Sequence, residues 1–583
     1  MVSWASCMVA RTDPPRAGRA GPVPPTATLP HPCRRRRSPT SIAVAVGPAA
    51  LAAALAGAAW ALGLRGTDVA AQVFRAHVAA RHGLVIWDPS WYGGFYPLSY
   101  SVLAPSLVAA LGPGVSGVVA AAGAAGAFDG LTRRLTGSRR PAGVWYFAAC
   151  TLIAVGVGQL TYLAGEALGL AALWAALGHR RGTAGLLGAL CALTSPLAAA
   201  FAVLAGLVML LPGLGGADLR RTGLRRRGPV GPARARPAAL LALCVSAGAT
   251  VLLVSAWAFP GDGPFPFAWT GFAVVEALCA LVVAAGAPKG LRLPTLLRVG
   301  AGAYGLATLA CFVVADPVGG NATRLAESAG VPALLCALGA VRPSWRRAVA
   351  LGALVPFVVW QWAPATEMTT RAGEPASDLA GFYRPLDAEL ASLAGGRPIR
   401  VEVVPTADHE ESAAVPSRLV SLARGWERQL DVARDPLFYR PGALSDASYL
   451  AWLRADGVAY VALARAPLDY AGRAEAGLLR AGVPGLTLVW SEGPWELWRV
   501  GGSPGLASGP GRVVSLGADQ VSLEVAHPGT LLVREHWTRF WTVRAGRACV
   551  APGAGDWTAV EARSPGRVTL GVSLLGPRDR CGS

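Results

Sequence analysis

Eleven apolar segments fill most of residues 41–363, and they restrict the fold more than any other feature of the chain. Charged residues make up 15% of the sequence, whereas typical soluble domains contain about 25%. Several segments reach the roughly 17–25 residues that a membrane-spanning helix requires. The segments are 41–64, 100–128, 142–157, 160–178, 183–194, 197–212, 238–257, 267–287, 294–315, 325–341 and 348–363. The sequence therefore predicts a polytopic α-helical membrane protein with about 11 spans.

Short basic clusters separate these segments and predict their orientation. The clusters lie at 34–37, 133–140, 179–181, 220–236, 289–292 and 342–347. Basic loops are retained on the cytoplasmic side of a membrane. A cytoplasmic N-terminus with eleven crossings satisfies every cluster and places everything after about residue 364 outside. The clusters also account for much of the net charge of +19, so no nucleic-acid partner is expected.

The stretch 183–212 is the difficult part of this topology. Both its flanks are basic, so the chain must enter the membrane and return, yet its length corresponds to about one and a half spans. Thr194-Ser195-Pro196 lies in its middle and is expected to form the tip of a short hairpin, because proline disfavours helix continuation. The number of spans stays open by one or two at this point.

The two ends of the chain differ from this apolar region. Residues 1–40 are rich in Pro, Arg and Ser and have no apolar core, so they are interpreted as a disordered cytoplasmic tail, or in part as the product of a misplaced start codon. Beyond residue 364, strand-like stretches at 398–404 and 457–463, a helical stretch at 445–453 and a hairpin at 486–500 predict an extracytoplasmic α/β domain over 365–500.

Several short strands follow a Gly/Ser/Pro linker at 501–510 and predict a second extracytoplasmic domain. They are expected at 512–516, 520–525, 530–534, 540–545, 557–562 and 567–573. This spacing is typical of a β-sandwich, here over 510–576. Cys549 and Cys581 lie in or beside this region, where a disulfide between them is expected. The cysteines of the apolar segments show no metal-ligand spacing, and neither a metal nor a cofactor is predicted.

The outer loop 65–99 carries the first group of candidate functional residues. If a helix runs from Thr67 to His82, then Asp68, Gln72 and Arg75 fall on one face, and Val69 and Ala76 on a neighbouring face that would lie on the membrane. In one interpretation Asp68 is a general base and Arg75 holds a phosphate. In the other, Asp68 caps the helix and Arg75 extends into the lipid interface.

An aromatic stretch completes this loop. Trp87, Asp88, Trp91 and Tyr92 precede the pair Gly93-Gly94. The aromatic rings are interpreted either as a stacking surface for a sugar or lipid or as an interfacial aromatic belt, which is the usual role of Trp and Tyr at this depth. Both interpretations stay open.

A second group of polar residues lies in or beside the apolar segments. Glu166 follows the outer end of segment 160–178, and ionisable residues within spans are often functional. Arg324, with Asn321 in the loop 316–324, is a candidate for binding a lipid phosphate; an ordinary connecting loop is the alternative. Glu276 lies in mid-segment without an obvious partner, and Asp129 is expected to pair with Arg133. The polar runs 409–411 and 424–431 are interpreted as a solvated or inter-domain surface.

These motifs resemble a group of bacterial integral membrane proteins described as YfhO-like or as related to 6-pyruvoyl-tetrahydropterin synthase. The resemblance is carried by Thr67-Asp68 with Gln72 and Arg75, by the stretches 87–94, 158–165 and 319–324, and by the terminal stretch 534–543, and it extends over nearly all of 41–576. It implies an architecture like that of the GT-C glycosyltransferases, which use polyprenyl-phosphate sugars and an acidic residue in the first outer loop as base. Asp68 stands at that position, but without the paired acidic motif that many such enzymes carry.

The leading hypothesis is a glycosyltransferase at the outer face of the cytoplasmic membrane that modifies a cell-envelope glycan, lipid or protein with a polyprenyl-phosphate-linked sugar. Asp68 would be the base, Arg75 and Arg324 would hold the donor phosphate, and the stretch 87–96 would line the sugar site. The outer domains would bind the acceptor. A transporter or flippase of envelope precursors and a non-catalytic scaffold for envelope assembly are the alternatives.

Overall fold

The computed structural model describes residues 39–136, 141–178, 180–211, 235–259, 263–285, 293–339, 341, 343–371, 380–575 and 579–582. The chain divides into two compact units, residues 1–43 and 44–583. The tail expected at 1–40 lies outside the described residues except for 39 and 40, which begin the first helix. The basic clusters at 34–37 and 289–292 and most of the cluster at 220–236 also lie outside the described residues.

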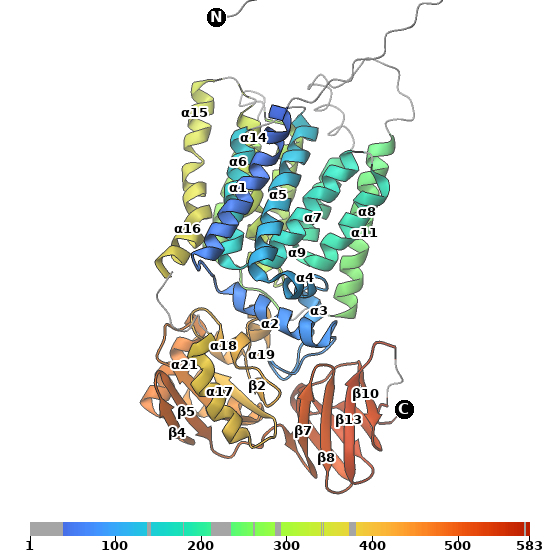
Figure 1. Cartoon of the computed structure of the whole chain (residues 1–583), viewed down its shortest axis with the longest axis vertical. Coiled ribbons are helices and arrows are strands. Elements are labelled where there is room, and N and C mark those ends of the chain that lie inside the picture. The colour runs from blue at the N-terminus through green and yellow to red at the C-terminus, as the bar shows by residue number, and fades with distance from the viewer. Residues whose placement is uncertain are drawn as a thin grey trace, which may run out of the picture. The chain divides into compact units, whose positions relative to one another are not determined.

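Helices gather in one bundle at the N-terminal side of the second unit (Figure 1). The bundle and its connections contain α1 (Pro39–Ala61), α2 (Asp68–His82), α3 (Pro97–Tyr100), α4 (Ala104–Leu111), α5 (Pro113–Thr136), α6 (Pro141–Val157), α7 (Leu160–Leu177), α8 (Arg181–Thr194), α9 (Pro196–Leu210), α11 (Ala235–Ala258), α12 (Trp269–Ala285), α13 (Thr295–Val313), the 3-10 helix η2 (Gly319–Thr323), the π-helix η3 (Ala326–Gly330), α14 (Val331–Leu338), α15 (Trp345–Gly352) and α16 (Val355–Arg371).

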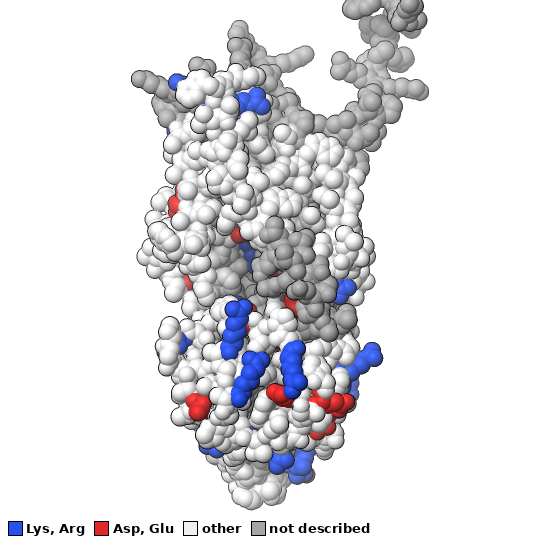
Figure 2. All heavy atoms as spheres, turned by 90° about the vertical axis from the view of Figure 1, so that its left-hand side faces the viewer, with Lys and Arg blue, Asp and Glu red and all other residues white. Residues whose placement is uncertain are grey.

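Four helical stretches are long and apolar enough to cross a membrane: Pro113–Thr136, Leu160–Leu177, Thr295–Val313 and Trp345–Ala365. Other apolar helices in the described part of the chain are 10–17 residues long. The structure is thus helix-rich with four candidate spans. Figure 2 shows, on one face, a largely uncharged surface over the bundle and charged side chains of both signs on the C-terminal part of the molecule. Uncharged, apolar side chains on this surface are what contact with lipid requires.

Small residues allow the helices to pack closely. Gly117 and Gly130 of α5 face Leu160 and Trp174 of α7, where a Cβ atom would lie within 3.2 Å and 2.6 Å of those side chains. Close approach at glycine is a common way to join helices in a membrane, where no hydrophobic force drives them together. The apolar segment expected over 100–128 is not continuous, because Gly112 (φ +77°) separates α4 from α5.

The break expected at Thr194-Ser195-Pro196 is confirmed. Helix α8 ends at Thr194, and α9 begins at Pro196 with Ser195 as its N-cap, where the serine hydroxyl accepts a hydrogen bond from the Ala198 amide. The Ser101 hydroxyl donates to the carbonyl of Thr194. The break therefore lies beside the start of α4, at the end of the bundle that carries the loop 65–99.

The α/β domain contains a five-stranded mixed sheet in the order β2-β1-β3-β5-β4, in which β1 is parallel to β2 and β3, and β5 is antiparallel to β3 and β4. The expected strands, helix and hairpin are confirmed. The domain contains α17 (Ala380–Ala394), β1 (Ile399–Val403), α18 (Glu411–Ala414), β2 (Val420–Leu422), α19 (Arg428–Arg434), η5 (Pro436–Phe438), α20 (Asp446–Ala455), β3 (Val458–Ala464), α21 (Tyr470–Ala481), β4 (Leu486–Glu492) and β5 (Trp495–Val500).

The C-terminal domain is a β-sandwich of two four-stranded sheets, β10-β13-β8-β7 and β11-β12-β9-β6. The six expected strands are present, and β6 and β11 are additional. The strands are β6 (Ala507–Ser508), β7 (Gly511–Gly517), β8 (Gln520–Val525), β9 (Gly529–His536), β10 (Trp541–Ala545), β11 (Ala548–Pro552), β12 (Trp557–Ala562) and β13 (Gly566–Val572).

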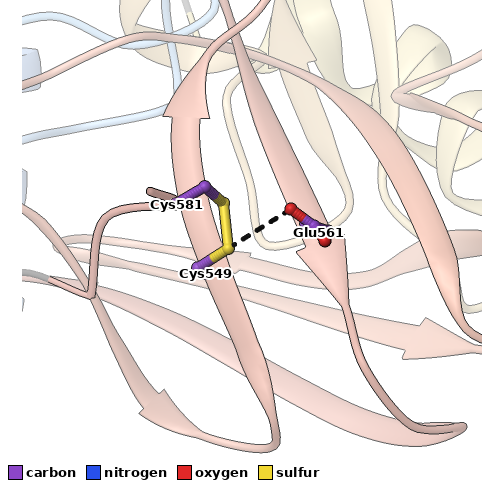
Figure 3. The surroundings of a disulfide bond; sticks show 3 residues. All are labelled: Cys549, Glu561 and Cys581. Carbon is purple, nitrogen blue, oxygen red and sulfur yellow. Dashed lines mark hydrogen bonds between the residues drawn. A yellow bond between two sulfur atoms is a disulfide. The ribbon is translucent and has the colours of Figure 1, made fainter. Parts of the chain in front are cut away.

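The expected disulfide between Cys549 and Cys581 is present and joins β11 to the chain end (Figure 3). Glu561 on β12 lies 3.6 Å from the Cys549 sulfur. These three residues form the one group of three metal-ligating side chains found among the described residues. Because both sulfurs are used in the disulfide, the group has no thiolate to offer a metal.

Candidate functional site

Helix α2 lies between the bundle and the α/β domain (Figure 1), where it packs against α4 on one side and α18 on the other. It begins at Asp68, whose carboxylate is favourably placed at a helix N-terminus, and ends at Gly83, which adopts φ +72°. The Thr67 side chain makes no capping hydrogen bond. Asp68, Gln72 and Arg75 all extend from α2 to other elements, and each contacts a different part of the molecule.

Asp68 lies next to Arg324, the residue that follows η2. The carboxylate Oδ2 is 3.7 Å from the guanidinium Nη2, beyond hydrogen-bonding distance, and the side chains are 25% and 17% exposed. The Arg324 guanidinium also lies over the ring of Tyr162 on α7, 5.7 Å from its centre. The structure thus brings together two of the residues singled out in the sequence, in a loose and partly open ion pair.

Four basic side chains affect the ionisation of Asp68. Burial raises the pKa of Asp68 above its ordinary value, while the charges of Arg324, His409, Arg75 and Arg428 oppose that rise. Two of the four, His409 and Arg428, come from the α/β domain. A site with one carboxylate among several cations can accept an anionic ligand while the carboxylate exchanges a proton.

Gln72 and Arg75 are buried and fix α2 in place. Gln72 accepts a hydrogen bond from the Thr161 hydroxyl (2.6 Å) and donates to the Tyr100 hydroxyl (3.0 Å). Arg75 donates to the Glu427 carboxylate at 2.6 Å, and its side chain is 2% exposed. The role expected for Arg75 as a phosphate ligand stays a prediction that this geometry does not favour, because the charge of Arg75 is neutralised by Glu427 in a region closed to solvent.

The environment of α2 also differs from the expected membrane-surface helix. Val69 and Ala76 are buried as expected, but Ala71 and Phe74 are buried too, in the core of the α/β domain. The first half of the helix is thus covered on more than one side. The physical reason is that the α/β domain packs against the side of α2 that the sequence pattern assigned to solvent.

The aromatic stretch forms neither an open stacking surface nor an interfacial belt. Trp91, Tyr92 and Phe95 belong to the core of the α/β domain, with Trp91 stacked on Phe74 at 3.9 Å. Trp87 belongs to the core of the β-sandwich. Their exposures are 0–2%. The substrate-lining roles expected for Trp87, Trp91 and Tyr92 stay predictions, and the burial of these side chains does not favour them.

Backbone hydrogen bonds join this stretch to both C-terminal domains. The Tyr92 amide donates to the Leu422 carbonyl, and the Leu422 amide donates to the Ser90 carbonyl. Residues 90–92 therefore extend the sheet beyond β2. Asp519 of the β-sandwich accepts from the amides of Ile86 and Trp87. Asp88, also expected to bind substrate, is 3% exposed and accepts from the Ser90 amide in a turn. This geometry does not favour the substrate-binding role, which stays a prediction.

Glu166 is 8% exposed and lies within hydrogen-bonding reach of Ser328 in η3. Ser328 also lies 3.5 Å from the Tyr162 hydroxyl. The π-helix that carries Ser328 begins two residues after Arg324, and π-turns within helices are frequent at functional sites. Tyr162 and Glu166, one turn apart on α7, therefore both face the segment 324–328.

Asn321 lies in η2, one turn before Arg324, and is half-buried. The Asp316 carboxylate accepts from the amides of Val318 and Gly319 and holds the start of this loop. Glu276 has a partner that the sequence did not indicate, the Thr308 hydroxyl of α13. Asp129 pairs with Arg133 at 3.2 Å, as expected.

His409 and Glu427 are the residues of this region whose importance the sequence did not reveal. Both lie in runs interpreted as a solvated or inter-domain surface, and both are buried, at 2% and 9% exposure. The His409 ring lies 3.4 Å from both Glu411 and Asp469. The sequence did contain a sign of this environment for His409, because neighbouring acidic residues favour the protonated form of a histidine.

A small pocket of about 20 Å³ lies between α2 and α4 and is lined in part by Arg75, Val78, Leu98 and Val102. It has room for a water molecule and is too small for a sugar. Asp68 does not line it. The chemistry of the region therefore centres on the Asp68–Arg324 pair and the groups around it. No protein-family model matches the chain, and the search of curated proteins found no match.

Proposed function

We propose that the chain is a multi-pass protein of the cytoplasmic membrane that transfers a sugar from a polyprenyl phosphate at the outer face. The observation that carries the proposal is the partly exposed pair of Asp68 and Arg324 at the end of the bundle that meets α2. We also propose membership of the YfhO-like group and a GT-C-like arrangement with about eleven spans, which rest on the sequence resemblance and on the apolar segments.

The proposed orientation follows from charge. Helix α5 carries Arg133 and Arg134 in its last turn, and Arg134 lies beside Gly178, which ends α7. The opposite end of α7 lies beside α2, where Gly158 contacts the backbone of Asp68 and Val69. Since basic ends remain in the cytoplasm, Asp68 and the C-terminal domains would lie outside.

In the proposed reaction an acceptor hydroxyl attacks the anomeric carbon of the donor sugar. A new carbon–oxygen bond forms, the bond from that carbon to the phosphate oxygen breaks, and the polyprenyl phosphate leaves with the electron pair. Asp68 takes the proton of the acceptor hydroxyl. Arg324 stabilises the negative charge of the departing phosphate.

The loose geometry of the pair supports this division of roles. By contrast, the ion pair Arg75–Glu427, which joins α2 to the α/β domain, is shorter at 2.6 Å and more buried. The Asp68 carboxylate and the Arg324 guanidinium are 3.7 Å apart and partly exposed. A phosphate can therefore replace the carboxylate beside Arg324 at little cost in free energy. That exchange would leave Asp68 free to accept a proton.

The test uses the full-length protein in lipid nanodiscs with a polyprenyl-phosphate hexose as donor. The Asp68→Asn variant should lose about 100-fold or more in turnover while still binding donor. Arg324→Gln should lose donor binding as well. Asp446→Asn, an exposed acid at the start of α20, serves as the control. Unchanged turnover in a stable Asp68→Asn protein would exclude the proposed reaction.

A non-catalytic scaffold is the second candidate. The observation in its favour is that residues 86–95, the most distinctive stretch of the sequence, pack into the cores of both C-terminal domains. The discriminating result is the behaviour of Asp68→Asn in cells. A scaffold should retain normal envelope assembly in that variant, whereas a glycosyltransferase should not.

A further inference from the structure

The β-sandwich is attached to the end of helix α11 through Arg539, which lies in the loop between β9 and β10 (Figure 1). The Arg539 guanidinium donates from Nη2 to the carbonyls of Trp257 and Ala258, at 2.7 Å and 3.0 Å. Both residues lie in the last turn of α11, where carbonyls have no partner within the helix. Because a cation is favourably placed at this end of a helix, Arg539 holds one edge of the β-sandwich against the bundle.

Aromatic side chains pack around the Arg539 guanidinium. It lies over the rings of Trp257 and Phe540, 4.9 Å and 5.0 Å from their centres. The ring centres of Phe540 and Phe259, the residue that follows α11, are 6.2 Å apart, and both rings contact the ring of Tyr96. The edge of the β-sandwich that contains the loop between β9 and β10 is therefore fixed beside the end of α11.

The end of α11 has the composition of a membrane surface. Trp257 in the last turn of α11 and Trp269 at the start of α12 lie on either side of one connection, and both side chains are exposed. Exposed tryptophans at the ends of apolar helices are typical of the boundary between lipid and water. Leu253 and Val254, one turn earlier, are exposed apolar side chains that lipid would cover. If the bundle spans a membrane as proposed, the attachment of Arg539 lies at the level of the lipid headgroups.

Two adjacent leucines lie beside this attachment. The end of β13 pairs with the start of β10, and the Ser573 amide donates to the Phe540 carbonyl at 3.0 Å. Leu574 and Leu575 come next in the chain and are 45% and 98% exposed. A single exposed leucine is ordinary on a protein surface. Two in succession, on an edge held against the end of an apolar helix, continue the exposed apolar surface of that helix and indicate an apolar partner.

We propose that Leu574 and Leu575 enter the outer leaflet of the membrane, so that the β-sandwich binds lipid directly. The partner is the bilayer itself: the two leucines reach the boundary between headgroups and acyl chains, and Arg539 lies with its stem along apolar surface and its charge among the headgroups. The β-sandwich is then a second point at which the outer domains contact the membrane. The inference rests on the proposed placement of the bundle in the membrane and does not require Asp68 to act as a base.

The experiment detects contact between Leu575 and lipid by photo-cross-linking. The photoreactive residue p-benzoylphenylalanine replaces Leu575 in the full-length protein, which is reconstituted in nanodiscs of phosphatidylethanolamine and phosphatidylglycerol. On irradiation the benzophenone attaches to C–H groups that touch it, and mass spectrometry identifies the attached molecule. Because the Leu575 side chain is exposed, its replacement should leave the fold intact.

Two other exposed leucines serve as matched controls for the same probe. Leu253 lies on α11 and should contact lipid, whereas Leu488 lies on β4, at the sheet edge opposite to the one that residues 90–92 extend. Lipid adducts are expected at Leu575 and Leu253 and should be absent at Leu488. Adducts at Leu253 without adducts at Leu575 would overturn the inference. Attachment of a second copy of the chain at Leu575, in place of lipid, would also overturn it.

A second measurement separates insertion from mere proximity. With the probe in place of Leu574, Leu575→Asp should abolish the lipid adducts, because a carboxylate is costly to bring among acyl chains. Leu575→Ile keeps the apolar character and should retain the adducts. Adducts at Leu574 that persist in Leu575→Asp would show that the leucines lie near lipid without entering it, and would overturn the inference.

Failure of the proposed reaction looks different. In that case Asp68→Asn leaves turnover unchanged, whereas lipid adducts at Leu575 are still found. Absence of adducts at both Leu253 and Leu575 would overturn the proposed placement of α11 in the membrane, and the inference with it.

Discussion

Arg75 and Glu427, 352 residues apart in the chain, form a buried ion pair in which the guanidinium donates to the carboxylate at 2.6 Å. The pair joins α2 to the loop before α19. The Arg75 guanidinium also lies over the ring of Tyr100, 4.1 Å from its centre. Since both side chains are at least nine-tenths buried, this pair is a principal attachment of the α/β domain to the loop 65–99.

Removing one partner of this pair should weaken that attachment severely. Arg75→Met leaves the Glu427 carboxylate buried without a counter-charge, a change that typically costs about 3–5 kcal/mol. The free energy of unfolding, measured by denaturant titration in detergent, should fall by about the same amount. Arg75→Met with Glu427→Leu should cost less than the single change, because no unpaired charge then remains.

The matched control is Arg465→Gln. Arg465 pairs with Glu496 at 2.8 Å, but its side chain is 66% exposed. Exposed pairs contribute roughly 0–1 kcal/mol. If Arg75→Met proves as mild as Arg465→Gln, then α2 is not attached to the domain through this pair.

Trp91 should act through stability and not through substrate affinity. Its side chain is fully buried, stacks on Phe74, and donates from Nε1 to the Ser412 carbonyl at 3.0 Å. Trp91→Ala should therefore lower the free energy of unfolding by about 3–5 kcal/mol. Trp257→Ala is the comparison, because Trp257 is 74% exposed. A raised KM for donor with unchanged stability would show instead that Trp91 lines a binding site.

Features determined by local sequence could be predicted. The apolar segments became helices because a long apolar stretch can satisfy its backbone only within itself in such an environment. The strands at 520–525 and 557–562 were recognised from alternation and from the turns around them. Strand β11 was missed because Ala548–Pro552 is short, contains one β-branched residue and ends in proline.

Features that depend on distant partners could not be predicted. Spacing correctly placed Asp68, Gln72 and Arg75 on one helix, but each has a partner 89 or more residues away that periodicity cannot identify, as Gln72 has in Thr161. Aromatic residues near a membrane suggest a belt or a binding surface; the sequence holds no local sign that Trp87 and Trp91 enter two different domain cores. His409 looked like part of a solvated surface for the same reason.

Glu535, at the contact between the two C-terminal domains, should make the free energy of unfolding depend on pH. The Arg400 guanidinium donates to its carboxylate at 2.8 Å, and both side chains are closed to solvent. Burial raises the pKa of Glu535 to about 8, although Arg400 opposes this. Because the folded protein then binds this proton more tightly than the unfolded chain, stability present at low pH should be lost as the pH rises toward 8.

The measurement compares wild type with Glu535→Gln from pH 5 to pH 9. The free energy of unfolding of wild type should fall relative to the variant by roughly 1 kcal/mol per pH unit up to about pH 8 and stay level above it. The difference between the two proteins isolates Glu535 from other titrating groups. A difference that does not change across this range would contradict the raised pKa.

The disulfide between Cys549 and Cys581 should stabilise the β-sandwich and report its location. It closes a loop with a sequence separation of 32, so replacing both cysteines with serine should cost about 3–4 kcal/mol. In intact cells, a membrane-impermeant maleimide should label the partly exposed Cys581 only after treatment with an impermeant reductant. Cys191 and Cys244 are buried in helices and should stay unlabelled. Labelling of Cys581 that requires permeabilised cells would place the domain in the cytoplasm, where a stable disulfide is not expected, and would reverse the proposed orientation.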